Sequence, residues 1–300
     1  ATLSFSEVQT ALLNQNESPA RQIVWNLRLP RALLGALVGL NLALAGVLLQ
    51  AVMHNPLAAP GVIGVSSGAG LAATIVLVLV PGWPTWLPVC ALVGGLLTAC
   101  VVYGVSWIPG TGTSPLRMIL AGVAITAMLG AFTTILMITY SDRVGSVVLW
   151  MSGSLNARSW NHVSLIWPYT FVGLVLAVVL IRPLNILQLG DEVAGGLGLR
   201  VELIRALTIL TASMLAGSAV SVSGMIGFVG LVVPHIMRML CGRNHAVIIP
   251  AAALGGACLT VCMDLTARTV IAPAELPVGV LIALIGSPYF IFLLYRTRLL

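Results

Sequence analysis

The charged residues of this chain are few, and they are the first place to look for chemistry. Only 7% of its 300 residues are charged, and the 14 basic residues are all arginine. A P-loop needs a lysine at the β- and γ-phosphates of a nucleotide, so a standard nucleotide-hydrolysing loop is excluded. The glycine-containing stretch 110–114 lacks both that lysine and the required spacing. If ATP drives this protein, another subunit must hydrolyse it.

Histidine and cysteine are common protein ligands for transition metals, and neither type is grouped here. Cys258 and Cys262 share one helical face, but no histidine or carboxylate near them completes a ligand set. The apolar runs also contain no nucleophile with a base beside it and no metal dyad. The sequence therefore predicts no enzyme, no resident metal and no cofactor. The four histidines are scattered: His54, His162, His235 and His245.

The elements that must position these residues are apolar. Hydrophobic residues make up 59% of the chain. Charged residues make up only 7%, whereas they make up about 25% of a usual soluble domain. This composition excludes a soluble enzyme, a nucleic-acid binder and a disordered chain. A membrane-spanning helix needs ~20 apolar residues, and 31 glycines favour close helix packing. Nine spans are predicted, at 29–53, 62–80, 86–108, 116–140, 163–181, 204–223, 225–241, 247–270 and 277–295.

The expected fold is therefore an all-α, polytopic membrane protein that forms one transmembrane domain over residues 1–300. Three polar segments interrupt or precede the spans. Residues 1–28 are predicted to be an external amphipathic segment, and 141–162, with interleaved tryptophans, a pair of external interfacial helices. Residues 182–203 hold the densest charge cluster and are predicted to form a cytoplasmic loop.

The distribution of arginine predicts the orientation. Nine spans place the two termini on opposite faces, and cytoplasmic segments are rich in basic residues. With the C-terminus inside, the cytoplasmic segments carry eight arginines against three acidic residues, and the external ones six against five. This bias favours a cytoplasmic C-terminus and an external Ala1.

A weak internal repeat is also present. Ala43-Leu44-Ala45-Gly46 precedes a Gly/Pro-interrupted stretch at 55–70, and Met214-Leu215-Ala216-Gly217 precedes another at 224–234. The predicted topology starts the two copies on opposite faces, which makes the repeat inverted. Interrupted helices at corresponding places in two halves indicate a transport pathway.

Four motifs carry a family resemblance. They are Arg28-Leu29-Pro30-Arg31; Asn55-Pro56-Leu57-Ala58 with Pro60-Gly61 and Gly64-Val65; Gly227-Phe228-Val229-Gly230-Leu231-Val232-Val233-Pro234-His235; and Glu275-Leu276-Pro277 with Gly279. In this order and spacing they resemble the FecCD family of permeases, the membrane subunits of binding-protein-dependent ABC importers for ferric siderophores, haem and cobalamin. Members typically have ten spans and an internal N-terminus, so the resemblance implies that the family's first helix is missing from this chain.

The resemblance also implies partners. These are a second permease, as a homodimer or a homologous pair, two ATPase subunits below, a periplasmic or lipid-anchored substrate-binding protein above, and the lipid of the cell inner membrane. The ATPase-coupling element of the family matches residues 185–202. The residues carried over to it are Leu189, Gly190, Asp191, Leu197 and Gly198.

Two further sets of site residues follow from the resemblance. Arg28, Arg31 and Arg268 match external arginines that receive acidic residues of the binding protein, although they could instead be interfacial anchors, and Asp264 could pair with Arg268. The cytoplasmic gate of the family's cobalamin permease matches two pairs of residues. Asn55 could equally well cap a helix there. The gate residues are Asn55, Leu57, Thr113 and Ser114.

The predicted function is thus that of an ABC importer permease for an iron chelate or a related metal cofactor, with ATP hydrolysis on a partner. The alternative is an ion-coupled secondary transporter. Such a transporter needs a buried carboxylate for coupling, and Asp264, with an arginine one turn away, is the candidate. The identity of the cargo stays open, because pathway residues in the family are mostly small or apolar.

Overall fold

The structure, a computed structural model, describes residues 4–13, 18–109 and 112–297. Most of these residues are helical, which confirms the predicted all-α class. The short strands β1 (Trp107–Ile108) and β2 (Gly112–Thr113) form one antiparallel hairpin. The helices are α1 Phe5–Leu13, α2 Pro19–Arg21, the π-helix Gln22–Arg28, α3 Leu29–Val52, α4 Val65–Leu79, α5 Leu87–Ser106, α6 Pro115–Thr139, α7 Val144–Met151, α8 Trp160–Val179, α9 Ile181–Leu187, α10 Asp191–Gly196, α11 Val201–Ser223, α12 Val229–Cys241, α13 His245–Thr269 and α14 Val278–Thr297.

A helix lies at each position where a span was predicted. In the described part of the chain, six helices are long and apolar enough to cross a membrane, and α4, α12 and α14 contribute shorter apolar segments. The two interrupted stretches of the predicted repeat are also non-helical at their start, at 53–59 and 224–228. A 3₁₀ turn, Pro60–Ile63, leads into α4. The inverted relation of the two halves stays a prediction.

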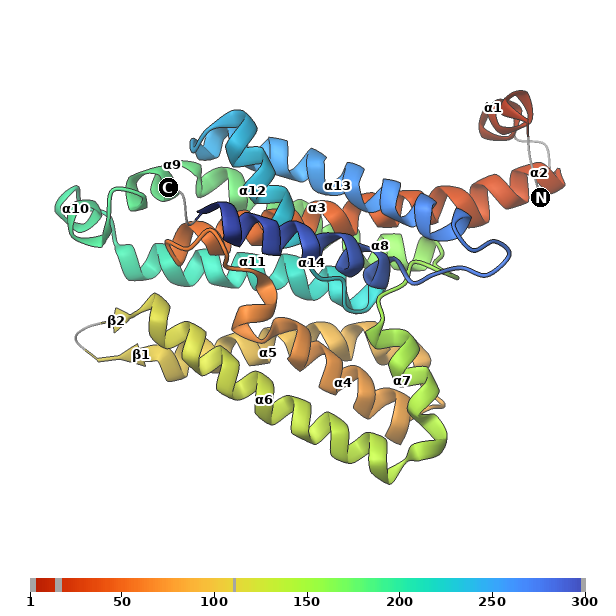
Figure 1. The fold of residues 1–300 in the computed structure, drawn as a ribbon, viewed down its shortest axis with the longest axis horizontal. Coiled ribbons are helices and arrows are strands. Elements are labelled where there is room, and N and C mark those ends of the chain that lie inside the picture. Colours follow the sequence, from red (N-terminus) through yellow and green to blue (C-terminus); the bar gives the residue numbers. More distant parts are fainter. Residues whose placement is uncertain (1–3, 14–17, 110–111, 298–300) are drawn as a thin grey trace.

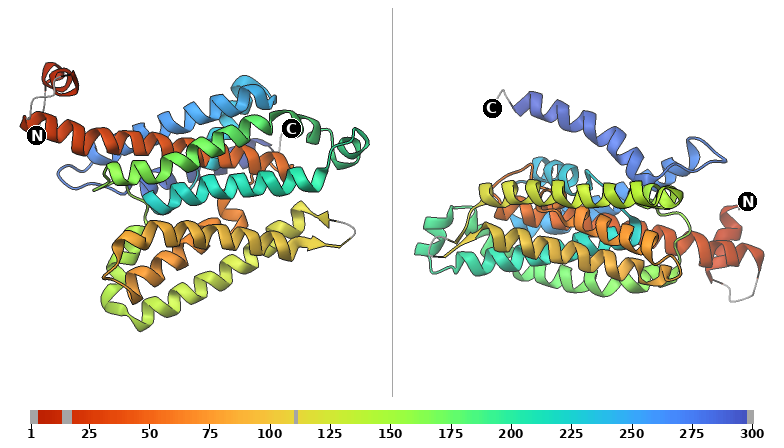
Figure 2. Two further views of the ribbon diagram at one scale, coloured as in Figure 1. Left: turned by 180° about the vertical axis from the view of Figure 1, so that it is seen from behind. Right: turned by 90° about the horizontal axis from the view of Figure 1, so that it is seen from below.

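Helix α3 forms the centre of the molecule. It packs against α8, α11, α12 and α13, and most of its length is buried. Figures 1 and 2 show these helices as one body, with α4, α5, α6 and α7 grouped beside it. Since α5 packs on α11, the two groups share an interface. A charged or bulky side chain on the buried part of α3 therefore contacts other helices and not solvent.

Small residues bring the central helices very close together. A Cβ added at Gly39 would lie 2.1 Å from the carbonyl oxygen of Gly256, and one added at Gly46 would lie 1.8 Å from that of Gly230. Close backbone approach is the usual way that membrane helices gain packing contacts, because lipid offers them no hydrophobic drive to associate. The high glycine content is thus used where α3 crosses α13 and α12.

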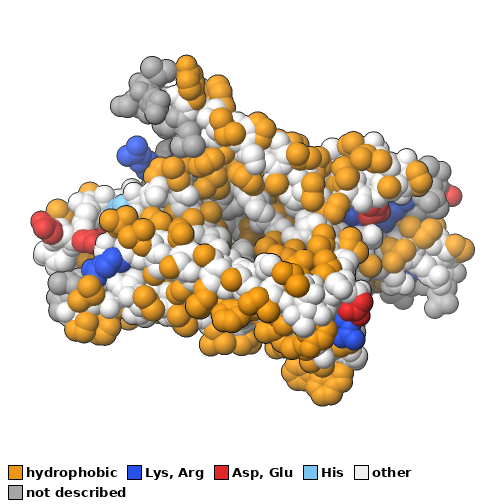
Figure 3. All heavy atoms as spheres, turned by 60° about the horizontal axis from the view of Figure 1, so that its bottom comes forward, with side chains coloured by type: hydrophobic (Ala, Val, Ile, Leu, Met, Phe, Trp, Pro, Cys, Tyr) orange, Lys and Arg blue, Asp and Glu red, His pale blue; other side chains and the backbone are white. Residues whose placement is uncertain are grey.

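The outer surface is apolar. Large hydrophobic side chains of α5, α6 and α8 are exposed, and Figure 3 shows hydrophobic side chains over most of the visible face. Only 11% of the apolar window of α6 is buried within the chain. In water such a surface marks an interaction site, so these helices must face lipid or another membrane protein.

The segment 141–162 differs from its prediction. The sequence predicts a pair of interfacial helices, but the structure forms a 3₁₀ turn at Ser141–Arg143 and the single helix α7. Residues 152–159 are not helical, and Trp160 begins α8. In the N-terminal segment, exposed Phe5 and Leu13 lie on α1, and the π-helix Gln22–Arg28 runs directly into α3.

Candidate functional site

The predicted site residues lie at the two opposite ends of the helix bundle. One end holds α10, the β1–β2 hairpin and the C-terminal end of α3, and we call it the α10 end. The other holds α2 and the C-terminal end of α13, and we call it the α2 end. Figure 1 shows both ends, with α10 and the hairpin on the left and α2 on the right.

The predicted coupling residues surround α10. Gly190 and Gly198 flank this helix with positive φ values of 100° and 83°, a conformation that side chains other than glycine rarely adopt. Leu189 and Leu197 expose their apolar side chains beside the charged first turn. A short helix between two glycines that presents leucine to solvent is suited to bind a partner protein.

The first predicted gate loop follows the C-terminal end of α3. The side chain of Asn55 accepts a hydrogen bond from the backbone N–H of Leu57 at 2.9 Å. This contact closes a turn within the non-helical stretch 53–59 and does not cap a helix, and gating stays a prediction. A polar cavity of about 290 Å³ adjoins the loop, with Gln50, His54 and Asn55 on one side and Gln188, directly after α9, on another.

The second predicted gate loop is the β1–β2 hairpin with the start of α6. Thr113 is buried, and its hydroxyl donates to Glu202 of α11 at 3.0 Å. Ser114 precedes the first residue of α6. Tertiary structure therefore places this loop against the N-terminal end of α11. In the described part of the chain, no hydrogen bond joins the two gate loops directly.

Arg205 is the central residue of this end, and the sequence prediction missed it. Its guanidinium donates to the backbone oxygen of Thr113 at 2.9 Å and to the carboxylate of Asp191 at 2.6 Å. A third hydrogen bond goes to Glu202, one helical turn away. The side chain is 1% exposed. An arginine within a predicted span was the available signal, because charges inside membrane segments are costly and usually functional.

The α2 end gives Arg31 a different environment from the one predicted. This residue is 9% exposed, and its guanidinium binds Asp264 of α13 at 2.9 Å and Glu275 at 2.8 Å. The prediction expected an external arginine that is available to a binding protein. In the structure Arg31 instead ties α3 to α13 and to the loop before α14, because the two helices pack antiparallel.

Arg28 and Arg268 keep more solvent contact. Arg28 is exposed at the end of the π-helix. Arg268 contacts Asp264 at 3.4 Å, as its spacing of four residues predicted, and its side chain is 30% exposed. Since Arg31 makes the shorter contact with Asp264, the main ion pair of that carboxylate joins α13 to α3.

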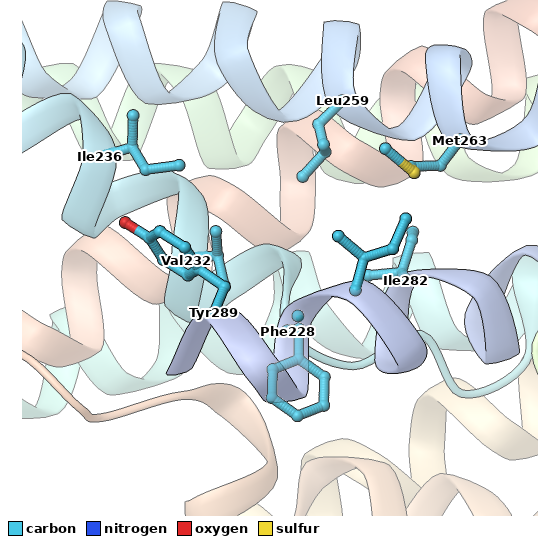
Figure 4. A pocket seen from close by; sticks show the side chains of 9 residues that line it. Phe228, Val232, Ile236, Leu259, Met263, Ile282 and Tyr289 are labelled. Atoms are coloured by element: carbon cyan, nitrogen blue, oxygen red, sulfur yellow. The ribbon is translucent and has the colours of Figure 1, made fainter. Parts of the chain in front are cut away.

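Two other features bear on chemistry. In the described part of the chain no group of three His, Cys, Asp or Glu residues could hold a metal ion. Figure 4 shows an apolar cavity of about 180 Å³ between α12, α13 and α14, with Phe228, Met263 and Ile282 on its wall. The hydroxyl of Tyr289 is the one polar side-chain group among the lining residues, so this cavity offers little to a charged cargo.

The comparisons with known proteins agree with one another. Residues 1–296 match the FecCD transport family. The chain is 42% identical over 299 residues to the "Hemin transport system permease protein HmuU" of Yersinia pestis, covering 96% of this chain and 87% of that protein. It is 40% identical over 277 residues to the "Fe(3+) dicitrate transport system permease protein FecD" of Escherichia coli (strain K12), covering 92% and 86%.

A solved structure has the same fold. It is described as an inward-facing conformation of a putative metal-chelate type ABC transporter, and the TM-score is 0.87 at 30% sequence identity. The match covers 97% of this chain and 96% of that one. The similarity therefore extends along the whole chain and includes both ends of the bundle.

Proposed function

The chain belongs to the FecCD transport family, and from this membership we propose that it is the permease subunit of an ABC importer that carries an iron chelate or a related metal cofactor. The observation that carries the proposal is the full-length identity of about two fifths to permeases named for hemin and ferric citrate. A metal that is enclosed in a chelate needs no protein ligand during passage, which is consistent with the absence of a metal cluster in the described residues.

A partner subunit supplies the ATP hydrolysis. The chain has no lysine with which to build a P-loop. The proposed docking site for the ATPase is α10 with its flanking residues, where Leu189, Leu197 and the glycines Gly190 and Gly198 lie. This assignment makes the α10 end cytoplasmic, in agreement with the arginine bias. The α2 end then faces outward from the inner membrane, toward a binding protein.

A second permease completes the transport pathway. The exposed apolar side chains of α6 provide an intramembrane surface for such a partner or for lipid. We place the gate at the cytoplasmic mouth of this pathway, at Asn55, Leu57, Thr113 and Ser114. Small polar and apolar groups suit a constriction that must close tightly without holding its cargo.

Reconstitution tests this function directly. The permease is co-expressed with a cognate ABC ATPase, and the complex is purified and placed in liposomes with a panel of iron chelates. We expect the ATPase to co-purify and uptake to require ATP. Uptake that an ionophore abolishes without any need for ATP would instead support the ion-coupled alternative. The bonding of Asp264 to Arg31 already disfavours that alternative, because its candidate carboxylate is occupied.

Docking of the binding protein is tested at Arg28. Reversing the charge in Arg28→Glu should weaken binding at low salt, since attraction to acidic residues becomes repulsion. Close interfacial charge pairs contribute about 1.5–7 kcal/mol, so we expect at least about a tenfold rise in Kd. The measurement is surface plasmon resonance on permease in nanodiscs.

The matched control for docking is Arg243→Glu, which reverses an exposed arginine at the opposite end of the bundle. It should leave the Kd unchanged. A charge swap on the binding protein should restore part of the affinity that Arg28→Glu loses. Equal affinities of Arg28→Glu and wild type at low salt would show that Arg28 is an interfacial anchor.

A further inference from the structure

Four separate segments of the chain meet at the α10 end through one polar network. Asp191 of α10 binds Arg205 of α11 at 2.6 Å. Arg205 in turn holds the backbone oxygen of Thr113 in the β1–β2 hairpin at 2.9 Å. On its other side, the Asp191 carboxylate lies 3.6 Å from the Nε2 atom of His54, next to Asn55. A single carboxylate of the coupling helix therefore contacts both gate loops, one directly and one through Arg205.

The geometry requires arginine at position 205. One guanidinium nitrogen, Nη1, donates to both Thr113 and Glu202, while Nη2 donates to Asp191. A planar guanidinium presents these donors in a fixed fork, whereas an ammonium group is a compact point charge on a flexible stem. Lysine at this position retains the charge but cannot hold Thr113 and Asp191 in the same relative position.

The two sides of the network differ in mobility. Arg205 is buried in the packed helix α11, so its position is determined by the bundle. Asp191 is half-exposed on α10, a helix of six residues that lies between two glycines with positive φ. Few packing contacts and flanking glycines favour local movement. A force on α10 therefore displaces Asp191 and pulls the guanidinium of Arg205, while the backbone of α11 stays in place.

We propose that Arg205 is the positioning residue through which movement of α10 reaches the gate, because its guanidinium binds Asp191 and the Thr113 hairpin at the same time. The inference rests on the proposed function, because it takes α10 as the ATPase-docking element and Thr113 as a gate residue. When α10 shifts and the Asp191 contact is lost, the guanidinium of Arg205 binds only Glu202 and Thr113. Its new position then displaces the hairpin that carries Thr113. The His54 contact transmits the same shift to the first gate loop.

The experiment measures coupling, and not merely activity. Arg205→Lys and Arg205→Met are reconstituted with the ATPase, and chelate uptake and ATP hydrolysis are measured on the same liposomes. We expect uptake per ATP hydrolysed to fall about tenfold, within the range of coupling between groups of one hydrogen-bond network. Arg243→Lys, an exposed arginine at the same end, is the matched control and should retain the wild-type ratio.

A merely structural Arg205 gives a different result. Loss of folded protein lowers uptake and hydrolysis together, so an unchanged ratio in both variants would overturn the inference. The ratio also separates this inference from the proposed function, because wild-type permease that shows no ATP-driven uptake contradicts the function itself.

A second variant keeps the test independent of folding. Asp191 is half-exposed, so Asp191→Asn should fold and should lower the same ratio. If Asp191 and Arg205 act as one unit, the double variant Asp191→Asn, Arg205→Met should show no greater loss than Arg205→Met alone. Losses that multiply in the double variant would show that the two residues act separately and would refute the proposed role of Arg205.

Discussion

Replacing Asp264 with leucine is expected to lower the free energy of unfolding by about 3–5 kcal/mol, the usual cost of removing one partner of a buried ion pair. Asp264 is buried, its two carboxylate oxygens share the single N–H of Arg31 Nε, and one of them also accepts from Nη2. In Asp264→Leu the arginine keeps only Glu275, whose side chain is 34% exposed. The buried guanidinium is then left without its main counter-charge.

Unfolding in mixed micelles of increasing SDS fraction measures this loss. Arg268→Ala is the matched control, because it removes a partner of the same carboxylate from a more exposed position. Its expected cost is below about 1 kcal/mol, as for other exposed pairs. A double variant, Arg31→Met with Asp264→Leu, should recover much of the stability, since an apolar pair can replace a buried ion pair. Equal costs for Asp264→Leu and Arg268→Ala would contradict this role of Arg31.

The burial of Arg31 also changes how docking can be tested. In Arg31→Glu the new carboxylate would lie beside Asp264 and Glu275 and would be repelled by both. A lower affinity for the binding protein could then result from a folding defect as well as from a lost docking contact. Arg28 is exposed, so a charge reversal there does not bury a glutamate beside Asp264 and Glu275. Docking by Arg31 and Arg268 stays a prediction, and the structure favours Arg28 for the experiment.

The second large effect is expected at the crossing of α3 and α12. In Gly46→Leu the new Cβ would lie 1.8 Å from the carbonyl oxygen of Gly230, a backbone atom that cannot rotate away. Overpacking commonly costs about 1–3 kcal/mol. Here the two helices must separate, so the free energy of unfolding should fall by at least the upper end of that range. We expect a large loss of monodisperse protein in gel filtration and a lower SDS fraction at the midpoint of unfolding.

Gly130→Leu provides the control for this substitution. Gly130 also lies within a predicted span, on α6, but nothing lies within 4 Å of an added Cβ. The variant should be as stable as wild type or more so, because leucine favours a helix by up to about 1 kcal/mol over glycine. A Gly46→Leu protein as stable as Gly130→Leu would show that α3 and α12 do not pack as closely as the structure indicates.

The sequence alone determined the class of this protein. Long apolar runs can satisfy their backbone groups within a membrane only as helices or closed barrels, so composition and run length predicted helices at all nine positions. The absence of lysine excluded a P-loop, and four short motifs identified the family. These properties are local, since each depends on residues that are close together in the chain.

Only the tertiary structure decided which charges meet. Spacing pairs Asp264 with Arg268, yet the closer partner is Arg31, 233 residues away. Likewise nothing in the neighbourhood of Arg205 indicates that it holds Thr113, 92 residues distant. In segment 141–162 the interleaved tryptophans suggested two helices, and the structure forms one. Pairing of distant side chains depends on how helices pack, and packing depends on small residues such as Gly39 and Gly46 whose contacts lie on other helices. A one-dimensional pattern records which residues can be buried, but the partner of a buried charge depends on which helices pack together.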